Sequence, residues 1–480
     1  MRDNLNSKTF SSLIWKLLER GGTQGIQFII QIFLARLLSP NDYGVIALIT
    51  VFIALANVFV QSGFSTALIQ KQNADEEDFS SVFYVSLLVA SILYMLLFLT
   101  APLIANFYNI QELVNIIRVL SLTLFLGAFN SIQNAIISRK MAFKNLFYSS
   151  LGAIIVSGVI GIIFAYKGFG VWTLVYQQLI NQFSICLILW FTVKWRPQLL
   201  FSFQRVKELF SFGGKLLLSV LIDTGYREIT NLIVGKIYTP VMLGYYNRGN
   251  QFPNLIVNNL NGSIQSVIFP VLASVQDDKG RIKDITRRAI VTSSYIVFPA
   301  MMGLIVIAEP MIKLILTEKW LPCVPYLRLF CLSYALWPIH TANLQAINAI
   351  GRSDIFLKLE IIKKIVGVSI IIITSRYSPL MMALGTVFSG IIGSFINSYP
   401  NKKLLNYSYF EQMKDILPSV ILSIIMGFVT YSVIFLGLSD LITIILQIIV
   451  GGVAYILLSY IVKLECFMYL LNIIYKKKRG

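Results

Sequence analysis

A long apolar stretch near the start of the chain carries several side chains that could bind a polar ligand. In WKLLERGGTQGIQFIIQIFLARLL (15–38), Arg20, Gln24, Gln27 and Gln31 are separated by three or four residues. At about 100° per residue, these side chains share one face of a helix. A guanidinium and three amides on one side of an apolar helix are expected to face a water-filled cavity.

A second apolar stretch, FGGKLLLSVLIDTGYREITNLIVGK (212–236), repeats this arrangement. Asp223, Arg227 and Asn231 lie four residues apart and also share one face of a helix. Because Asp223 and Arg227 are one turn apart, we expect them to form an ion pair and partly neutralise each other. The same geometry places Glu228 away from this face.

Cations outnumber acids in the apolar stretches. Arg118 and Arg328 are two more such cations, and Arg248 opens a further stretch in GYYNRGNQF (244–252). An excess of positive charge suits a phosphate or diphosphate group, which arginine binds through two hydrogen bonds. Each of these residues could instead have a structural role. Arg118 and Arg328 could form contacts between lobes, and Arg248 could anchor its helix at the membrane interface. Asp223 and Arg227 could form a static pair that locks their helix.

The sequence favours a transporter over an enzyme. It has no Asp-x-Asp sequence, no histidine cluster and no long loop to hold a catalytic site, so we expect no catalytic residue, metal site or cofactor. The only histidine, His340, is expected to be hydrogen-bonded in the core, and the four cysteines are expected to pack in apolar surroundings. The acidic loop NADEEDF (73–79) is expected to be solvated charge.

Hydropathy predicts an all-α polytopic membrane protein. Hydrophobic residues make up 56% of the 480 residues, charged residues only 13%, and several apolar runs exceed the ~20 residues that cross a bilayer as a helix. We predict about fourteen transmembrane helices, at 10–36, 45–69, 79–104, 113–137, 146–166, 171–193, 209–234, 249–272, 289–308, 326–350, 358–375, 380–399, 416–436 and 441–462.

Basic residues set the predicted orientation. The chain has 40 Lys and Arg and a net charge of +18, and most of these cations fall in loops on the side that would hold both termini. The positive-inside rule therefore places both termini in the cytoplasm. This charge is expected to contact anionic membrane lipids rather than nucleic acid.

An internal repeat organises the chain. ARLLSPNDYG (35–44) and GKIYTPVMLG (235–244) both carry a basic residue, then Ser or Thr followed by Pro, and later a Gly. We predict two pseudo-symmetric six-helix lobes, residues 1–200 and 201–405, followed by a C-terminal helix pair and basic tail, residues 406–480. In each hinge, proline is expected to stop one helix and glycine to permit the turn into the next.

Two stretches of the chain resemble a known protein family. They are ERGGTQGIQFIIQIFLARLLSPNDYGVIAL (19–48) and LSVLIDTGYREITNLIVGKIYTPVMLGYYNRGNQF (218–252). The chain resembles the polysaccharide-transporter branch of the multidrug/oligosaccharidyl-lipid/polysaccharide exporter superfamily, the bacterial oligosaccharide-lipid flippases. The resemblance implies two six-helix lobes, an extra helix pair and a cavity that opens alternately to each face of the membrane.

It also implies a substrate, an undecaprenyl-diphosphate-linked oligosaccharide, moved to the outer leaflet of the bacterial inner membrane for capsule, O-antigen or exopolysaccharide assembly. A polysaccharide polymerase and export machinery are implied partners. Related flippases place cations on the first helix of a lobe, which fits Arg20 and, by the repeat, Arg227. Gln27 stands where the second lobe has Arg227, so a complete arginine set is not carried over.

Two other transport functions stay open. A drug/cation antiporter of the same superfamily would need a net acidic cavity, for which Asp223 and Glu228 are the deep candidates. A scramblase-like lipid mover would need no selectivity for a glycan.

Overall fold

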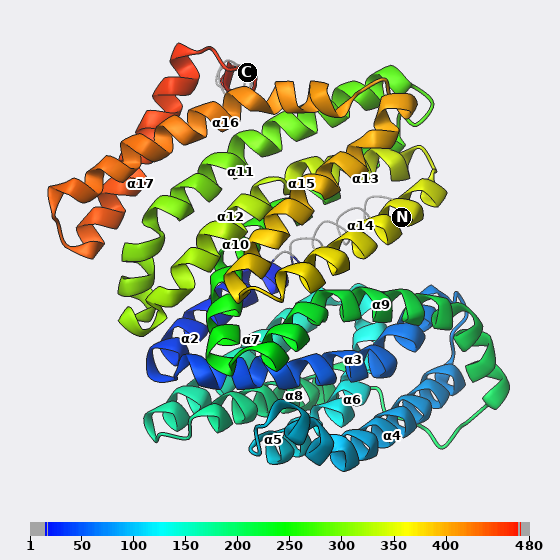
Figure 1. Ribbon diagram of the computed structural model, residues 1–480. Coiled ribbons are helices and arrows are strands. Elements are labelled where there is room, and N and C mark those ends of the chain that lie inside the picture. The colour runs from blue at the N-terminus through cyan, green and yellow to red at the C-terminus, as the bar shows by residue number, and fades with distance from the viewer. Residues whose placement is uncertain (1–14, 17, 469–470, 472–480) are drawn as a thin grey trace. The chain divides into compact units, whose positions relative to one another are not determined.

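The computed structural model describes residues 15–16, 18–468 and 471, and the regular elements of these residues are all helical (Figure 1). The helices up to the second hinge are η1 (Leu18–Gly22), α2 (Thr23–Leu37), α3 (Pro40–Gln70), α4 (Glu76–Tyr108), α5 (Leu113–Leu120), α6 (Thr123–Lys140), α7 (Phe143–Tyr166), α8 (Val171–Val193) and α9 (Phe203–Ile237). Those that follow are α10 (Pro240–Ala273), α11 (Lys279–Leu316), η2 (Glu318–Cys323), α12 (Val324–Ala335), α13 (Trp337–Ala349), α14 (Ser353–Thr374), α15 (Pro379–Leu404), α16 (Tyr409–Tyr431), η3 (Ser432–Leu436) and α17 (Asp440–Ile461).

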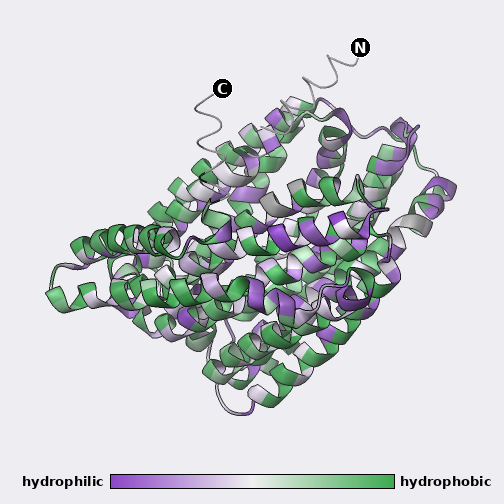
Figure 2. Ribbon diagram, turned by 90° about the horizontal axis from the view of Figure 1, so that it is seen from above, coloured by the Kyte–Doolittle hydropathy of each residue, from purple (hydrophilic) through white to green (hydrophobic). Residues whose placement is uncertain are grey.

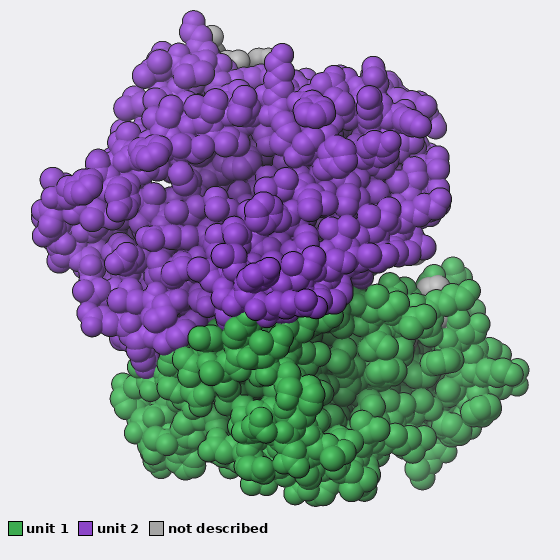
Figure 3. Space-filling view, viewed as in Figure 1, with its two compact units in different colours: residues 1–244 green, residues 245–480 purple. Residues whose placement is uncertain are grey.

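The chain forms two compact units, residues 1–244 and 245–480 (Figure 3). Helix α9 belongs to the first unit because it packs closely on α3. A Cβ atom added to Gly235 of α9 would lie only 2.0 Å from Cδ2 of Leu48 on α3, so α9 needs a glycine there. The predicted division of the chain follows the sequence repeat and has other boundaries than these units. Its ranges, 1–200, 201–405 and 406–480, stay a prediction.

Nine helices of the described residues are long and apolar enough to cross a membrane. They also expose large apolar side chains: on α4, the exposed fractions are 60% for Leu88, 66% for Leu99 and 69% for Leu103. Hydrophobic residues accordingly make up much of the helices in Figure 2. Apolar exposure on this scale indicates contact with lipid, so the protein spans a membrane several times.

The remaining predicted spans coincide with helices that are shorter or more polar, namely α2, α9, α10, α14 and the pair α12 and α13. Helices α2, α12 and α13 are short, with 15, 12 and 13 residues. The total of about fourteen spans and the cytoplasmic position of both termini stay predictions.

The two hinges have matching geometry. Helices α2 and α9 end at Leu37 and Ile237, and a proline is the first residue of both α3 and α10. In the first hinge, the Ser39 hydroxyl accepts a hydrogen bond from the Asp42 N–H at 3.3 Å, and the Asp42 carboxylate accepts one from the Ser39 N–H at 2.8 Å. In the second, the Thr239 hydroxyl accepts from the Met242 N–H at 3.3 Å. Proline at the first helical position and a hydroxyl cap before it are strong local signals for a helix start.

The predicted role of the hinge glycines is wrong. Gly44 and Gly244 lie inside α3 and α10 and make no turn. A Cβ atom on Gly44 would lie 1.7 Å from the Pro240 carbonyl oxygen, and one on Gly244 would lie 2.1 Å from the Pro40 carbonyl oxygen. The starts of the two helices therefore touch backbone to backbone, a contact that membrane helices make through small residues.

Replacing Gly44 by alanine should destabilise the protein. The added methyl group meets backbone atoms, which cannot rotate away, so the two helix starts must separate at a cost of about 1–3 kcal/mol. We expect a lower Tm for thermal unfolding of the purified protein in detergent. The matched control is Gly303→Ala in α11, where a Cβ would meet nothing within 4 Å. Equal Tm values for the two variants would contradict the contact.

Candidate functional site

The polar residues predicted on the first span lie on η1 and α2. The backbone of Arg20 is part of η1, but its side chain lies outside the part of the structure that is described. On α2, Gln24 and Gln31 are half-buried and Gln27 is exposed. The Gln24 side-chain oxygen is buried and accepts no hydrogen bond from the described residues.

Gln27 and Gln31 line a cavity of about 330 Å³ within the first unit, which we call the amide cavity. Its walls come from α2, α3, α7 and α8. Two of the three glutamines of the predicted stripe thus face a polar cavity. The lining residues are Gln27, Gln31, Tyr43, Ile46, Thr50, Ile154, Ser157, Leu174, Gln177, Gln178, Asn181 and Gln182.

Helix α8 adds four amide side chains to this cavity that were not predicted from the sequence. They occur in YQQLINQF (176–183), where positions 177, 178, 181 and 182 lie on one side of an otherwise apolar helix. That spacing is a detectable signal. Amides give a weaker signal than charged residues in an apolar helix.

The ion pair predicted on α9 is confirmed: the Arg227 guanidinium donates a hydrogen bond to the Asp223 carboxylate. The Arg227 side chain is 69% exposed, so protein does not cover its guanidinium. The direction of Glu228 relative to this face stays a prediction. Asn231 donates a hydrogen bond from Nδ2 to Glu228 Oε2 at 2.7 Å, because residues three apart are neighbours on a helix.

Arg118 and Arg328 make similar contacts, each within its own unit. Nε of Arg118 donates to the Phe98 carbonyl oxygen at 3.4 Å, and Nε of Arg328 donates to the Ile305 carbonyl oxygen at 3.3 Å. The Arg118 guanidinium also lies 4.2 Å from the centre of the Phe98 ring. These contacts join α5 to α4 and α12 to α11, so both arginines hold neighbouring helices together.

Arg248 of α10 is buried, with 5% of the residue exposed. Its guanidinium lies 5.0 Å from the centre of the Trp320 ring and donates a hydrogen bond to Gln251. Its burial separates it from solvent, unlike Arg227. A role for Arg248 in substrate binding stays a prediction.

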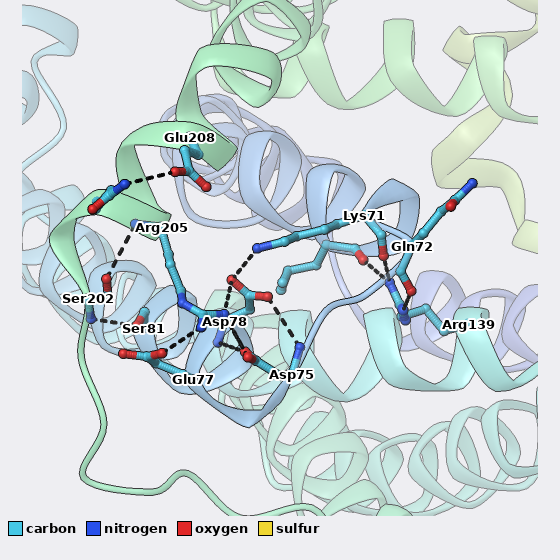
Figure 4. A network of polar contacts seen from close by, with 12 residues as sticks. Lys71, Gln72, Asp75, Glu77, Asp78, Ser81, Arg139, Ser202, Arg205 and Glu208 are labelled. Carbon is cyan, nitrogen blue, oxygen red and sulfur yellow. Dashed lines mark hydrogen bonds and ion pairs between the residues drawn. The ribbon is translucent and has the colours of Figure 1, made fainter.

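The acidic loop before α4 is not simply solvated charge, and this expectation is wrong for Asp78. Its side chain is fully buried, 2.7 Å from Lys71 Nζ and 3.4 Å from an Arg205 guanidinium nitrogen (Figure 4). Arg205 also pairs with Asp75 at 2.7 Å and Glu77 at 2.8 Å. The hydrogen bond from the Asp78 backbone N–H, helped by Arg205, lowers the pKa of Asp75 below its usual value.

This network, which we call the acidic clamp (Lys71, Asp75, Glu77, Asp78 and Arg205), connects the end of α3 to the starts of α4 and α9. Nearby, Arg139 of α6 donates hydrogen bonds to the carbonyl oxygens of Leu68, Lys71 and Gln72 (Figure 4). Those carbonyls belong to the last turn of α3 and the loop after it, and a basic side chain satisfies such groups well. The arrangement is a structural clamp rather than a reaction centre.

The remaining reactive side chains have structural positions. Cys323, Cys331 and Cys466 are buried free thiols and Cys186 is half-buried, as packing residues should be. His340 Nδ1 lies 3.0 Å from Asn397 Nδ2, which confirms the expected hydrogen bond. Among the described residues, no group of three or more His, Cys, Asp or Glu is arranged to hold a metal ion.

The family model described as "Polysaccharide biosynthesis protein" matches residues 33–325, more than half of the chain. The chain belongs to this family. Its relatives include the teichuronic acid biosynthesis protein TuaB of Bacillus subtilis, 25% identical, with 79% of each chain covered. The succinoglycan biosynthesis transport protein ExoT of Rhizobium meliloti is 24% identical over 76% of this chain and 74% of its own. The lipopolysaccharide biosynthesis protein WzxC of Escherichia coli is 23% identical, with 87% and 83% covered.

Solved structures show the fold of this family member. The inward closed conformation of the lipid II flippase MurJ matches with a TM-score of 0.77 and 18% identity, covering 94% of this chain and 98% of its own. An inward-facing multidrug resistance MATE family transporter matches with a TM-score of 0.61 and 16% identity, covering 80% and 96%. The chain therefore has the fold of these two proteins, and it is closer to MurJ than to this MATE transporter.

Proposed function

We propose that this member of the polysaccharide biosynthesis protein family is a flippase for undecaprenyl-diphosphate-linked oligosaccharide repeat units. It moves them from the inner to the outer leaflet of the bacterial inner membrane, with both of its own termini in the cytoplasm. The proposal rests on one combination: the chain matches a family model for polysaccharide biosynthesis and also has the fold of a lipid II flippase. ExoT, a relative named as a transport protein, adds support.

The two parts of such a substrate need different side chains. We assign the diphosphate to Arg227, whose exposed guanidinium can donate two parallel hydrogen bonds to an anion, and to Arg20. Asp223 orients Arg227 through the ion pair. Gln24, Gln27, Gln31 and Asn231 supply neutral polar contacts. Arg118 and Arg328 contribute indirectly, through the helices that they hold, and Arg248 is a further candidate for substrate binding.

The polar contacts on α9 favour a flippase over the drug/cation antiporter. A cation carrier needs carboxylates that are available to a positive ligand. Here Asp223 is bonded to Arg227 and Glu228 to Asn231. The face thus offers an exposed guanidinium, which suits an anionic substrate.

Deletion of the gene tests the proposal in cells. We expect loss of surface polysaccharide together with accumulation of undecaprenyl-diphosphate-linked repeat units, both restored by the wild-type gene. Mass spectrometry of the accumulated lipid would identify the repeat unit. Unchanged glycans with altered sensitivity to cationic drugs would contradict the proposal and support the antiporter.

A further inference from the structure

We propose that the amide cavity of the first unit is a saccharide subsite. It would bind part of the uncharged sugar portion of the substrate, while the α9 arginine binds the diphosphate. The inference rests on the proposed function and assigns to α8 a part in choosing the glycan.

The chemistry of the lining selects a neutral, hydroxyl-rich ligand. None of the twelve described residues that line the cavity is charged, and six of them are Gln or Asn. Each amide offers both a donor and an acceptor, which matches a sugar hydroxyl that both donates and accepts. A bare phosphate or cation would be buried there without an opposite charge, at a high cost in free energy.

Several of these amides are held in place by neighbouring side chains. Asn181 donates to Ser157 Oγ at 3.1 Å, and Asn130, which is 4% exposed, donates to Gln182 Oε1 at 3.3 Å. Gln177 packs against Gly161 of α7, where an added Cβ would lie 3.1 Å from Gln177 Cγ. Side chains fixed in this way bind with less loss of conformational freedom.

Three amides of the cavity, Gln177 among them, keep hydrogen-bonding capacity for a ligand. Among the described residues, the side chains of Gln27, Gln177 and Gln178 make no hydrogen bond to protein, and Tyr43 reaches Gln31 only at 3.4 Å. Polar groups inside a membrane-spanning unit need partners, which a ligand or water must supply. Ile46, Ile154 and Leu174 complete the wall with apolar surface that can face the C–H groups of a sugar ring.

The size of the cavity limits what it can hold. A volume of about 330 Å³ lies at the low end of the ~300–1,000 Å³ found for small-molecule sites. It therefore suits a small part of the repeat unit rather than the whole lipid-linked oligosaccharide. Residues of the amide cavity should affect which sugars are accepted and leave recognition of the diphosphate unchanged.

The test compares two probes on the purified full-length protein by native mass spectrometry. One probe is the lipid-linked repeat unit extracted from the deletion strain, and the other is undecaprenyl diphosphate without sugars. Leucine in place of both Gln27 and Gln178 keeps side-chain size but removes up to two ligand hydrogen bonds. Because each contributes about 0.5–1.5 kcal/mol, we expect roughly 10-fold weaker binding of the first probe and unchanged binding of the second.

Three further variants make the result interpretable. Gln111→Leu removes an exposed amide outside the cavity, and we expect it to change neither affinity nor Tm. Gln178→Asn keeps an amide but shortens it, so it tests the site even if the double leucine variant does not fold. We expect it to weaken binding of the first probe alone. Arg227→Ala should weaken binding of both probes.

The outcomes separate the subsite from the proposed function. If wild-type protein binds neither probe, the proposed function fails and the subsite fails with it. If wild-type protein binds both, and the amide variants bind both as well as wild type does or lose both equally, the subsite is overturned and the proposed function stands.

Discussion

Replacing Arg227 by alanine should abolish polymer export while the protein still inserts in the membrane. Its guanidinium is exposed on α9 and fixed by Asp223. Charge-assisted hydrogen bonds contribute about 1.5–3 kcal/mol each, so we expect affinity for the lipid-linked substrate to fall about 10- to 100-fold. Surface polysaccharide in the complemented deletion strain, normalised to the amount of protein in the membrane, measures the effect. Arg20→Ala should act in the same direction.

The matched control for this experiment is Arg281→Ala. Arg281 is also exposed, at 73%, and lies 3.5 Å from Asp278, the residue that caps the start of its helix, α11. It lies in the first turn of α11, next to the charged loop before that helix, and not on the polar face of α9, so we expect normal export from this variant. Normal export by both Arg227→Ala and Arg20→Ala would contradict a cationic binding site for the diphosphate.

Replacing Asp78 by alanine should give the largest loss of stability. The change leaves Lys71 and Arg205 without the buried carboxylate that lies 2.7 Å and 3.4 Å from them. Breaking a buried ion pair from one side costs about 3–5 kcal/mol, and we expect the lower part of this range because both cations are 30% exposed. The measurements are the Tm in detergent and the amount of protein recovered from membranes.

Asp277→Ala controls for the loss of a carboxylate from a loop. Asp277 is exposed, and exposed substitutions usually change the free energy of unfolding by less than about 0.5 kcal/mol. If Asp78→Ala and Asp277→Ala have the same Tm, the acidic clamp does not stabilise the fold.

Local chemistry explains which features could be predicted from the sequence. Pro40 and Pro240, each preceded by a hydroxyl side chain, define helix starts without help from distant residues. The spacing of Asp223 and Arg227 likewise fixes their ion pair, because one helical turn brings them together. Apolar length was sufficient to predict a polytopic helical membrane protein.

Features that depend on packing between distant parts of the chain could not be predicted from the sequence. Asp78 is buried and lies 3.4 Å from Arg205, which is far away in the sequence. Gly44 and Gly244 look like turn residues until their contacts with Pro240 and Pro40 are known. The α8 amides could have been predicted to share one face, because YQQLINQF shows their helical spacing. Polar residues without charge, however, give a weaker signal in an apolar helix.

Translocation by the purified protein in liposomes tests the central claim most directly. The lipid-linked repeat unit would be incorporated on both leaflets, and an enzyme added outside would modify only outward-facing sugars. We predict that wild-type protein makes the inner pool accessible and that Arg227→Ala does so far more slowly, while a fluorescent phospholipid stays in its leaflet. Accessibility no faster than in protein-free liposomes would contradict the flippase, and equal movement of the phospholipid would indicate a scramblase.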